Sequence, residues 1–185
     1  MAQAGENGRV VATAADPRHR FSKTPSAAIT IIAGIGVAGD AHAGELVQHQ
    51  SRVRADPTQP NLRQVHLIHA ELLDELALNG FAVAPGQLGE NITTTGIDLL
   101  GLSRGTLLAV GDTVVLEVTG LRNPCRQIES FRPGLLARLA RKRSDGSIER
   151  LGGIMAVALC GGTISVGDVI RVQPPAEPFE ALGPV

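Results

Sequence analysis

Residues 106–119, TLLAVGDTVVLEVT, contain two runs of aliphatic and β-branched residues joined by Val-Gly-Asp. Each run has the length of a strand and Gly-Asp is typical of a tight turn, so this stretch predicts two adjacent β-strands. A similar corner occurs in residues 162–169, GTISVGDV, where Val-Gly-Asp again precedes a β-rich run. We interpret the two segments as similar local turns and not as copies of a repeated unit.

Further strands are predicted on either side of this stretch, because other β-branched runs also stop at glycines. They cover residues 28–32, 154–159 and 168–172, while residues 64–68 fit either a strand or the start of a helix. Two helices are predicted over residues 70–79, which end at Gly80, and over residues 134–142, which end in basic residues. Because short strands outnumber helices, the sequence predicts a mainly β protein, a closed β-barrel with a few peripheral helices.

The composition indicates one domain with tails. The chain has 185 residues, of which 43% are hydrophobic and 19% are charged, an ordinary balance for a globular protein. Residues 1–20 have no sustained period and are predicted to form a flexible arm. Residues 21–173 are then the barrel domain, and residues 174–185, which contain four prolines, are predicted to be a loose tail.

Two classes of partner are not expected. The formal net charge is −1, the basic residues are dispersed, and the chain has no Trp or Tyr and only four Phe. A nucleic acid would therefore find neither a basic footprint nor a set of stacking aromatics. No leader pattern and no apolar run of bilayer length occurs, so we expect no membrane association and a cytoplasmic location in which both cysteines are reduced.

Cys125 is the residue best placed for chemistry. It lies in residues 121–128, LRNPCRQI, directly after a predicted strand. Pro124 restricts the backbone before the thiol, and the guanidinium groups of Arg122 and Arg126 favour the thiolate. A thiolate can act as a soft metal ligand, a nucleophile or a persulfide carrier. The alternative, a buried and inert cysteine, fits Cys160 better, because Cys160 ends an apolar strand.

A second group of candidate residues lies in GVAGDAHAG, residues 36–44. Asp40 and His42 are two residues apart, so an extended backbone would point both side chains to one side. They could hold a metal together with another histidine, of which the candidates are His49, His66 and His69. A glycine-rich turn in which Asp40 caps backbone amides explains the same residues. Spacing alone leaves both interpretations open.

A third group lies in PGQLGENI, residues 85–92. Gly89 indicates a turn that presents Glu90 and Asn91 at the start of a strand. A carboxylate and an amide suit the edge of a heterocycle, although a plain polar turn has the same composition.

Taken in order, these motifs resemble the MOSC domain, which is named for the C-terminal part of the molybdenum cofactor sulfurase. The resemblance covers residues 21–172, and its most specific part is the pair GENI at residues 89–92 and RNPC at residues 122–125. The other matching segments are SKTP at 22–25, GDAHAG at 39–44, RQV at 63–65, GQL at 86–88, VGD at 110–112, GG at 152–153 and VGD at 166–168. The resemblance implies a pyruvate-kinase-like β-barrel.

It also implies that the protein binds the molybdenum cofactor (molybdopterin), with Cys125 as a ligand to the metal. Three cationic residues are then expected at the phosphate of the cofactor: Lys23, Arg63 and Arg122. Glu90, Asn91 and the backbone amides near Gly89 are expected beside its pterin, and Pro124 is expected to contact the cofactor as well. Asp40 and His42 are expected to position a small-molecule substrate or to move a proton.

Relatives of this kind reduce N-hydroxylated substrates, as the mitochondrial amidoxime-reducing component does, and others transfer sulfur. We therefore expect a redox enzyme for N-hydroxylated small molecules, with a persulfide carrier that uses Cys125 as the alternative and a metal-dependent hydrolase built on Asp40 and His42 as a weaker one. The chain has no segment with four cysteines for an iron–sulfur cluster, so a separate electron-donor or sulfur-donor protein is expected. Residues 45–62 predict a long loop over the site, and monomer and homodimer both stay open.

Overall fold

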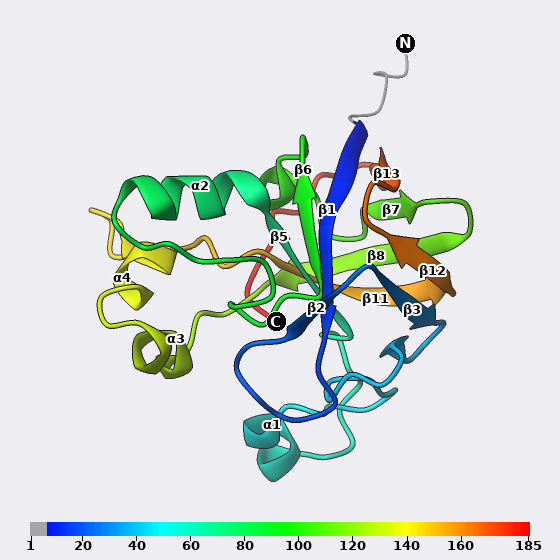
Figure 1. Ribbon diagram of the computed structural model, residues 1–185, viewed down its shortest axis with the longest axis horizontal. Helices are drawn as coiled ribbons and strands as arrows, with labels where there is room; N and C mark the ends of the chain where they lie inside the picture. The colour runs from blue at the N-terminus through cyan, green and yellow to red at the C-terminus, as the bar shows by residue number, and fades with distance from the viewer. Residues whose placement is uncertain (1–6) are drawn as a thin grey trace.

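The computed structural model describes residues 7–185 and contains a closed barrel with helices on one side (Figure 1). The seven barrel strands are β1 (Asn7–Ala15), β5 (Val65–His69), β6 (Ile92–Thr95), β7 (Leu107–Val110), β8 (Val114–Leu121), β11 (Ile154–Cys160) and β13 (Val169–Gln173). Their order around the barrel is β13-β7-β8-β11-β5-β6-β1, and β1 pairs with β13 to close it. Only β5 and β6 run parallel, and the other neighbours are antiparallel. The predicted mainly β barrel is confirmed.

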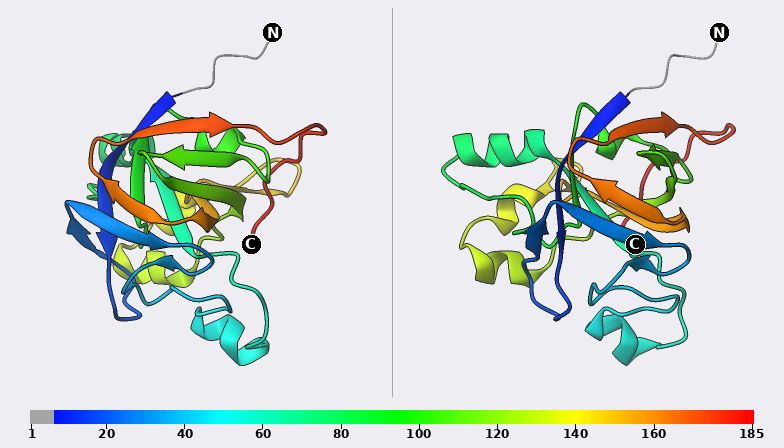
Figure 2. Two further views of the ribbon diagram at one scale, coloured as in Figure 1. Left: turned by 90° about the vertical axis from the view of Figure 1, so that its right-hand side faces the viewer. Right: turned by 45° about the vertical axis from the view of Figure 1, so that its right-hand side comes forward.

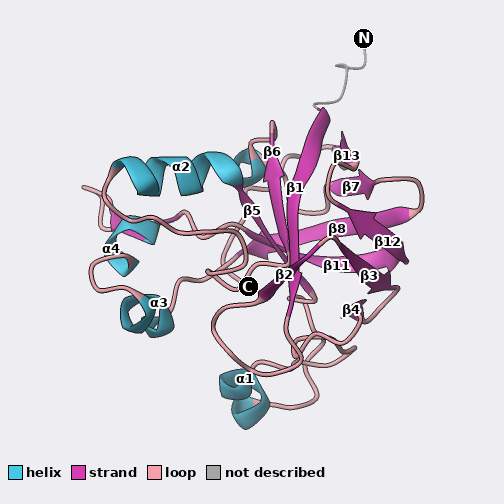
Figure 3. Ribbon diagram, viewed as in Figure 1, coloured by secondary structure: helices cyan, strands magenta, loops and turns pink. Residues whose placement is uncertain are grey.

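The remaining elements surround the barrel. A small sheet contains β12 (Gly162–Ser165), β3 (Ala28–Ile32) and β4 (Gly36–Val37), and β2 (Thr24–Ser26) pairs antiparallel with the end of β1. The helices are α1 (Gln50–Ala55), α2 (Ala70–Leu78), α3 (Arg126–Phe131) and α4 (Leu136–Leu139), with the short 3-10 helix η1 at Leu99–Gly101. Figure 3 shows α2, α3 and α4 gathered on one flank, whereas α1 stands apart on a long loop.

Two hydrophobic cores hold these parts together, and β5 contributes to both. Leu67 points into the barrel, where it packs among Leu108, Leu116 and Ile154. The next residue, Ile68, belongs to the core between the barrel and the helices. This alternation follows from the period of two along a strand, so one buried strand connects the barrel to its helical flank.

The predicted helix over residues 134–142 is shorter than expected. Only Leu136–Leu139 is helical, and Ala140–Lys142 forms strand β9, which pairs with β10 (Ile148–Arg150). The helix is short because a tight turn joins β9 to β10. In this turn Gly146 has a φ of +85° and Asp145 accepts a hydrogen bond from the amide of Ser147. A tight turn of this kind returns the chain as a hairpin, which ends the helix early.

The flexible arm predicted over residues 1–20 is wrong for residues 7–15, which form β1; residues 1–6 lie outside the described part. Val10 and Ala14 are buried in the structure, because both edges of β1 pair with other barrel strands. Gly8 admits this packing, since a Cβ there would collide with Ile97. The apolar pattern of this segment is too weak to predict a strand, and the segment forms one because it pairs with β13 and β6.

The C-terminal segment is also ordered, against the prediction of a loose tail. The amide of Arg104 donates to the Glu180 carbonyl at 2.9 Å, and the amide of Leu121 donates to the Gly183 carbonyl at 2.7 Å. Figure 2 shows the segment turning back from the end of β13 along the barrel. Within residues 7–185 no helix has both the length and the apolar character needed to cross a membrane.

Candidate functional site

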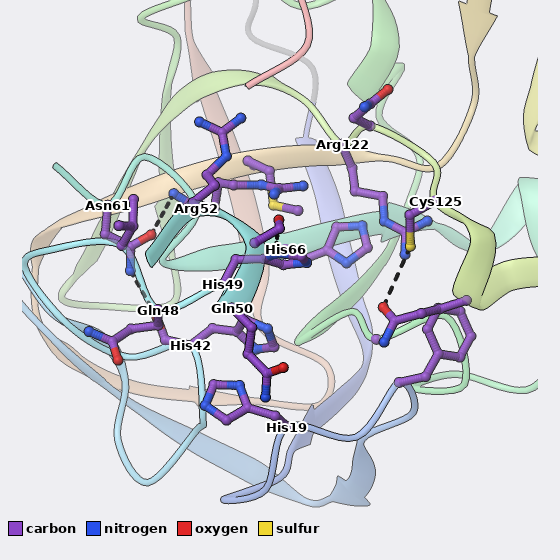
Figure 4. Close-up of a pocket in the computed structure, with 18 of the residues that line it drawn as sticks. His19, His42, Gln48, His49, Gln50, Arg52, Asn61, His66, Arg122 and Cys125 are labelled. Carbon is purple, nitrogen blue, oxygen red and sulfur yellow. Dashed lines mark hydrogen bonds between the residues drawn. The ribbon is translucent and has the colours of Figure 1, made fainter. Parts of the chain in front are cut away.

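A cavity of about 480 Å³ lies between the barrel and the loops that carry the predicted site residues (Figure 4). Sites for small molecules and cofactors usually have volumes of about 300–1,000 Å³. The lining comes from segments that are distant in sequence: residues 19–23, 42–54, 61–66, 88–91 and 122–127, together with Met155 and Val185. Seven of the ten predicted site residues line it: Lys23, His42, Arg63, Gly89, Asn91, Arg122 and Cys125.

Cys125 lies on the cavity wall as the N-cap residue of α3 and is half-buried. The loop that carries it leaves the end of β8, and the amide of Arg122 holds this loop by donating to the Gly153 carbonyl at 3.0 Å. The sulfur of Cys125 lies 3.5 Å from the Gln127 side-chain oxygen. Pro124 shapes this loop without lining the cavity. The predicted position of the thiol on a loop at the end of a strand is confirmed.

Cys160 does not match its prediction. It was expected to be a buried thiol, yet it is exposed at the last position of β11. The register of β11 against β8 shifts between Ala158 and Cys160, so the strand leaves the core before its end. The second thiol therefore lies on the surface and outside the cavity lining.

Two arginines beside Cys125 carry buried hydrogen-bond donors that have no partner in the described residues. They are Nε of Arg63 and Nη1 of Arg122. The other terminal nitrogen of Arg122, Nη2, donates to the Leu88 carbonyl at 3.4 Å. Burial, and then the charges of Arg52 and Arg122, lower the pKa of Arg63 to about 10, although Cys125 acts to raise it. Arg126, the other predicted neighbour of the thiol, is exposed and outside the lining. The cations at Cys125 thus come from Arg63 and Arg122.

Asp40 lies just behind the cavity wall and joins three neighbouring residues through four contacts. One oxygen accepts from Lys23 Nζ at 2.8 Å and from Asn91 Nδ2 at 3.1 Å, and the other accepts from the backbone amide of His42 at 2.9 Å. The His42 ring Nδ1 lies 3.3 Å from that second oxygen. Burial acts to raise the pKa of Asp40, but His42 and the charge of Lys23 hold it well below its usual value. The ammonium group of Lys23, which was expected at a phosphate, is therefore paired with Asp40.

Glu90 is turned away from the cavity, against the expectation that it meets a pterin. Its carboxylate is buried and accepts from the amides of Gly86 at 2.6 Å and Leu88 at 3.1 Å. It therefore closes the turn of its own loop. Asn91 reaches the lining, but its amide nitrogen donates to Ala14 and Asp40 and its oxygen accepts from His66.

Four histidines line the cavity, and only His42 has a carboxylate partner in the described residues. The ring centroid of His42 lies 5.7 Å from that of His19 and 6.3 Å from that of His49. Burial, and then the charge of Arg63, lower the pKa of His49 to about 4. His66 is buried, and its Nε2 lies 2.8 Å from the Gly152 carbonyl.

The alternative of a metal site on Asp40 and His42 finds no complete set of ligands in the described part of the chain. Across residues 7–185, no group of three or more His, Cys, Asp or Glu side chains is arranged to hold a metal ion. His69, one of the proposed partners, lies outside the lining. The other interpretation of residues 36–44 agrees with the structure, because Asp40 accepts hydrogen bonds from backbone amides.

Several lining residues have no signal of their own in the sequence. They include His19, Arg20 and Phe21 from the loop after β1, together with Arg52 and Arg54 from α1. The predicted long loop of residues 45–62 does lie at the site and supplies the α1 residues. Asn61 holds this loop, because its amide donates to the carbonyls of His42 at 2.9 Å and Gly44 at 3.0 Å.

Comparison with known proteins gives the family of the chain. The MOSC domain model matches residues 40–171, which is most of the chain. The YuaD protein from Bacillus subtilis has a similar structure, with a TM-score of 0.74, 23% sequence identity, and coverage of 91% of this chain and 97% of that one. YiiM from Escherichia coli is similar with a TM-score of 0.61, 16% identity, and coverage of 94% of this chain and 73% of that one.

YiiM from Geobacillus stearothermophilus is also similar, with a TM-score of 0.57, 15% identity, and coverage of 97% of this chain and 78% of that one. At these identities the solved structures show a shared fold. No curated protein matches the chain. The family match spans the barrel from Asp40 to β13 and includes the Cys125 loop. The chain therefore belongs to the MOSC domain family.

Proposed function

We propose that this protein binds the molybdenum cofactor in the cavity beside Cys125 and reduces N-hydroxylated small molecules there. The MOSC family is generally associated with molybdenum-cofactor binding. The observation that carries the proposal is the pair of unpartnered buried donors, Arg63 Nε and Arg122 Nη1, which flank Cys125. Buried guanidinium donors without partners are costly, so their position at the cavity favours an anionic ligand.

The donors present fit this cofactor. A thiolate at Cys125 is the soft ligand that a metal with sulfur coordination accepts, and Arg63 and Arg122 match the oxygens of a phosphate. When bound, the group supplies two-electron redox chemistry, which the side chains of the protein lack. Gln127 and Asn123 border Cys125 on the same wall and offer amides to the edge of a heterocycle.

The residues of the chain would then bind the substrate and supply protons. Reduction of an N-hydroxylated compound, R–NHOH + 2 e⁻ + 2 H⁺ → R–NH₂ + H₂O, breaks the N–O bond and releases water. His42 is suited to deliver a proton to the leaving oxygen, because Asp40 holds its Nδ1 and leaves Nε2 for the cavity. The two electrons would come from a separate electron-donor protein.

Metal analysis of two cysteine variants tests the proposal. Wild type, Cys125→Ala and Cys160→Ala are purified from cells that synthesise the cofactor, and molybdenum is measured by mass spectrometry. We expect near-stoichiometric molybdenum in wild type and in Cys160→Ala, and a severalfold loss in Cys125→Ala. Cys160→Ala is the matched control, because it removes an exposed thiol outside the cavity.

The same proteins distinguish the proposed redox role from sulfur transfer. A persulfide on Cys125 would lose its outer sulfur to cyanide as thiocyanate and return to the thiolate. Absence of molybdenum in all three proteins, with thiocyanate released from wild type but not from Cys125→Ala, would replace the redox proposal with a sulfur carrier that receives its sulfur from a donor protein.

A further inference from the structure

The cavity carries more positive charge than one cofactor phosphate requires. Its lining contains six side chains of lysine or arginine and four histidines: Arg20, Lys23, Arg52, Arg54, Arg63, Arg122, His19, His42, His49 and His66. Within residues 7–185, no aspartate or glutamate belongs to this lining. A concave wall of one charge sign attracts ligands of the opposite sign.

Two of the six cations are balanced by acids behind the wall. Lys23 is paired with Asp40 at 2.8 Å, and Nε of Arg20 lies 3.8 Å from a carboxylate oxygen of Asp16. The other four, Arg52, Arg54, Arg63 and Arg122, form no ion pair with any carboxylate of the described residues. These four arginines are therefore available to a ligand.

The four arginines that form no ion pair within residues 7–185 extend along the cavity from Cys125 to α1. The charge of Cys125 affects Arg122, whereas Arg63 is affected by the charges of both Arg52 and Cys125 and therefore lies between α1 and the thiol. Arg52 and Arg54 come from α1, a helix with no buried residue, and Figure 4 shows Arg52 on the His49 side, away from Cys125. A cofactor that is ligated by Cys125 and held by Arg63 and Arg122 would leave Arg52 and Arg54 without a counter-charge. We call the surface formed by these two arginines the α1 wall.

We propose that the α1 wall selects substrates that carry an oxyanion, such as a carboxylate, in addition to the N-hydroxylated group. This inference rests on the proposed function for the reacting group, but the anion site itself consists of residues of the chain. Arg52 and Arg54 would bind the oxyanion while the N–O group points toward Cys125. Charge-assisted hydrogen bonds of this kind contribute about tenfold or more in affinity.

Binding and turnover of three matched aryl amidoximes test the proposal. One is neutral, one carries a para-carboxylate and one carries a para-trimethylammonium group. Dissociation constants of the matching aryl amides, which cannot be reduced, are measured by calorimetry, and KM and kcat are measured for the amidoximes. We expect the carboxylate to bind about tenfold or more tightly than the neutral compound and the cation to bind least. This preference should shrink in high salt, because Arg54 is exposed.

Arg52→Ala/Arg54→Ala is the diagnostic variant, and Arg104→Ala removes an exposed arginine outside the lining as its control. We expect the double variant to lose the preference for the carboxylate while its molybdenum content stays as in wild type. A preference that persists in the double variant would overturn the inference, and so would loss of molybdenum from it. Wild type without molybdenum that still prefers the carboxylate through Arg52 and Arg54 would overturn the proposed function alone.

Discussion

Replacement of Lys23 by methionine tests whether this lysine serves the fold or a phosphate. Its side chain is 4% exposed and that of Asp40 is fully buried, with 2.8 Å between Nζ and the carboxylate. Lys23→Met keeps most of the apolar stem but leaves the Asp40 charge without its cation. Removal of one partner from a buried ion pair costs about 3–5 kcal/mol. Asp40 keeps donors from Asn91, His42 and the Asp16 amide, so we expect a loss near the lower end of that range.

Urea unfolding of the cofactor-free protein measures this loss. With a slope of about 2–3 kcal/mol per molar urea, the midpoint should fall by about 1 M at neutral pH. The double variant Lys23→Met/Asp40→Asn removes the uncompensated charge, so its loss should be smaller than the sum of the two single losses by about 1–3 kcal/mol.

The dependence on pH provides a second check. The folded-state pKa of Asp40 lies below its unfolded value, so its contribution to stability is complete above about pH 4 and is lost as the pH falls below that. Lys23 supports part of this contribution, so the difference between wild type and Lys23→Met should shrink as the pH falls through this range. If Lys23→Met loses less than about 1 kcal/mol of unfolding free energy at neutral pH and also contains less molybdenum, the structural role is refuted. Lys23 would then be assigned to the phosphate of the cofactor, as the sequence predicts.

Four further substitutions test the packing of the site and its support. Burial holds the folded-state pKa of His66 well below its ordinary value, so its contribution to stability is present above about pH 6.5 and lost as the pH falls. In His66→Gln, the free energy of unfolding measured in urea should fall less steeply between about pH 6.5 and 5 than in wild type. An equal dependence on pH in the two proteins would contradict this role of His66. Gly153→Ala places a Cβ against the Leu67 carbonyl at a φ of +87°, so it should cost about 2–4 kcal/mol. Gly34→Ala, at a φ of +72° with open space, should cost only about 1 kcal/mol, and equal losses would contradict the steric argument. Leu139→Ala empties a fully buried position of the helical core and should lower stability by about 2–5 kcal/mol in thermal unfolding, whereas a loss under 1 kcal/mol would contradict that packing.

The strands were predictable wherever a complete local pattern occurs in the sequence. Residues 28–32 form β3 over the predicted range, and β7 and β8 meet at the Gly111 corner as the opening stretch indicates. The position of Cys125 after β8 was predictable for the same reason, since Pro124 and the preceding strand are local features. Patterns that depend on a partner were missed, as β1 and the β9–β10 hairpin illustrate.

The roles of the polar residues depended on three-dimensional contacts. Lys23, Arg63 and Arg122 are equivalent as cations in the sequence, yet only Lys23 meets a buried carboxylate in the described residues. Glu90 and Asn91 are adjacent, yet Glu90 closes its own turn and Asn91 joins Asp40 to β5.

The sequence by itself determined the β-rich barrel, the family and the position of Cys125 directly after a strand, because strand patterns, turn glycines and short motifs are local. Only the tertiary structure decided which charges remain free to bind a ligand. Arg52 from α1 joins Arg63 and Arg122 around one cavity, while Asp40 neutralises Lys23 behind the wall. Coulomb interactions and burial depend on distance in space, and segments far apart in the chain come together only when the barrel closes.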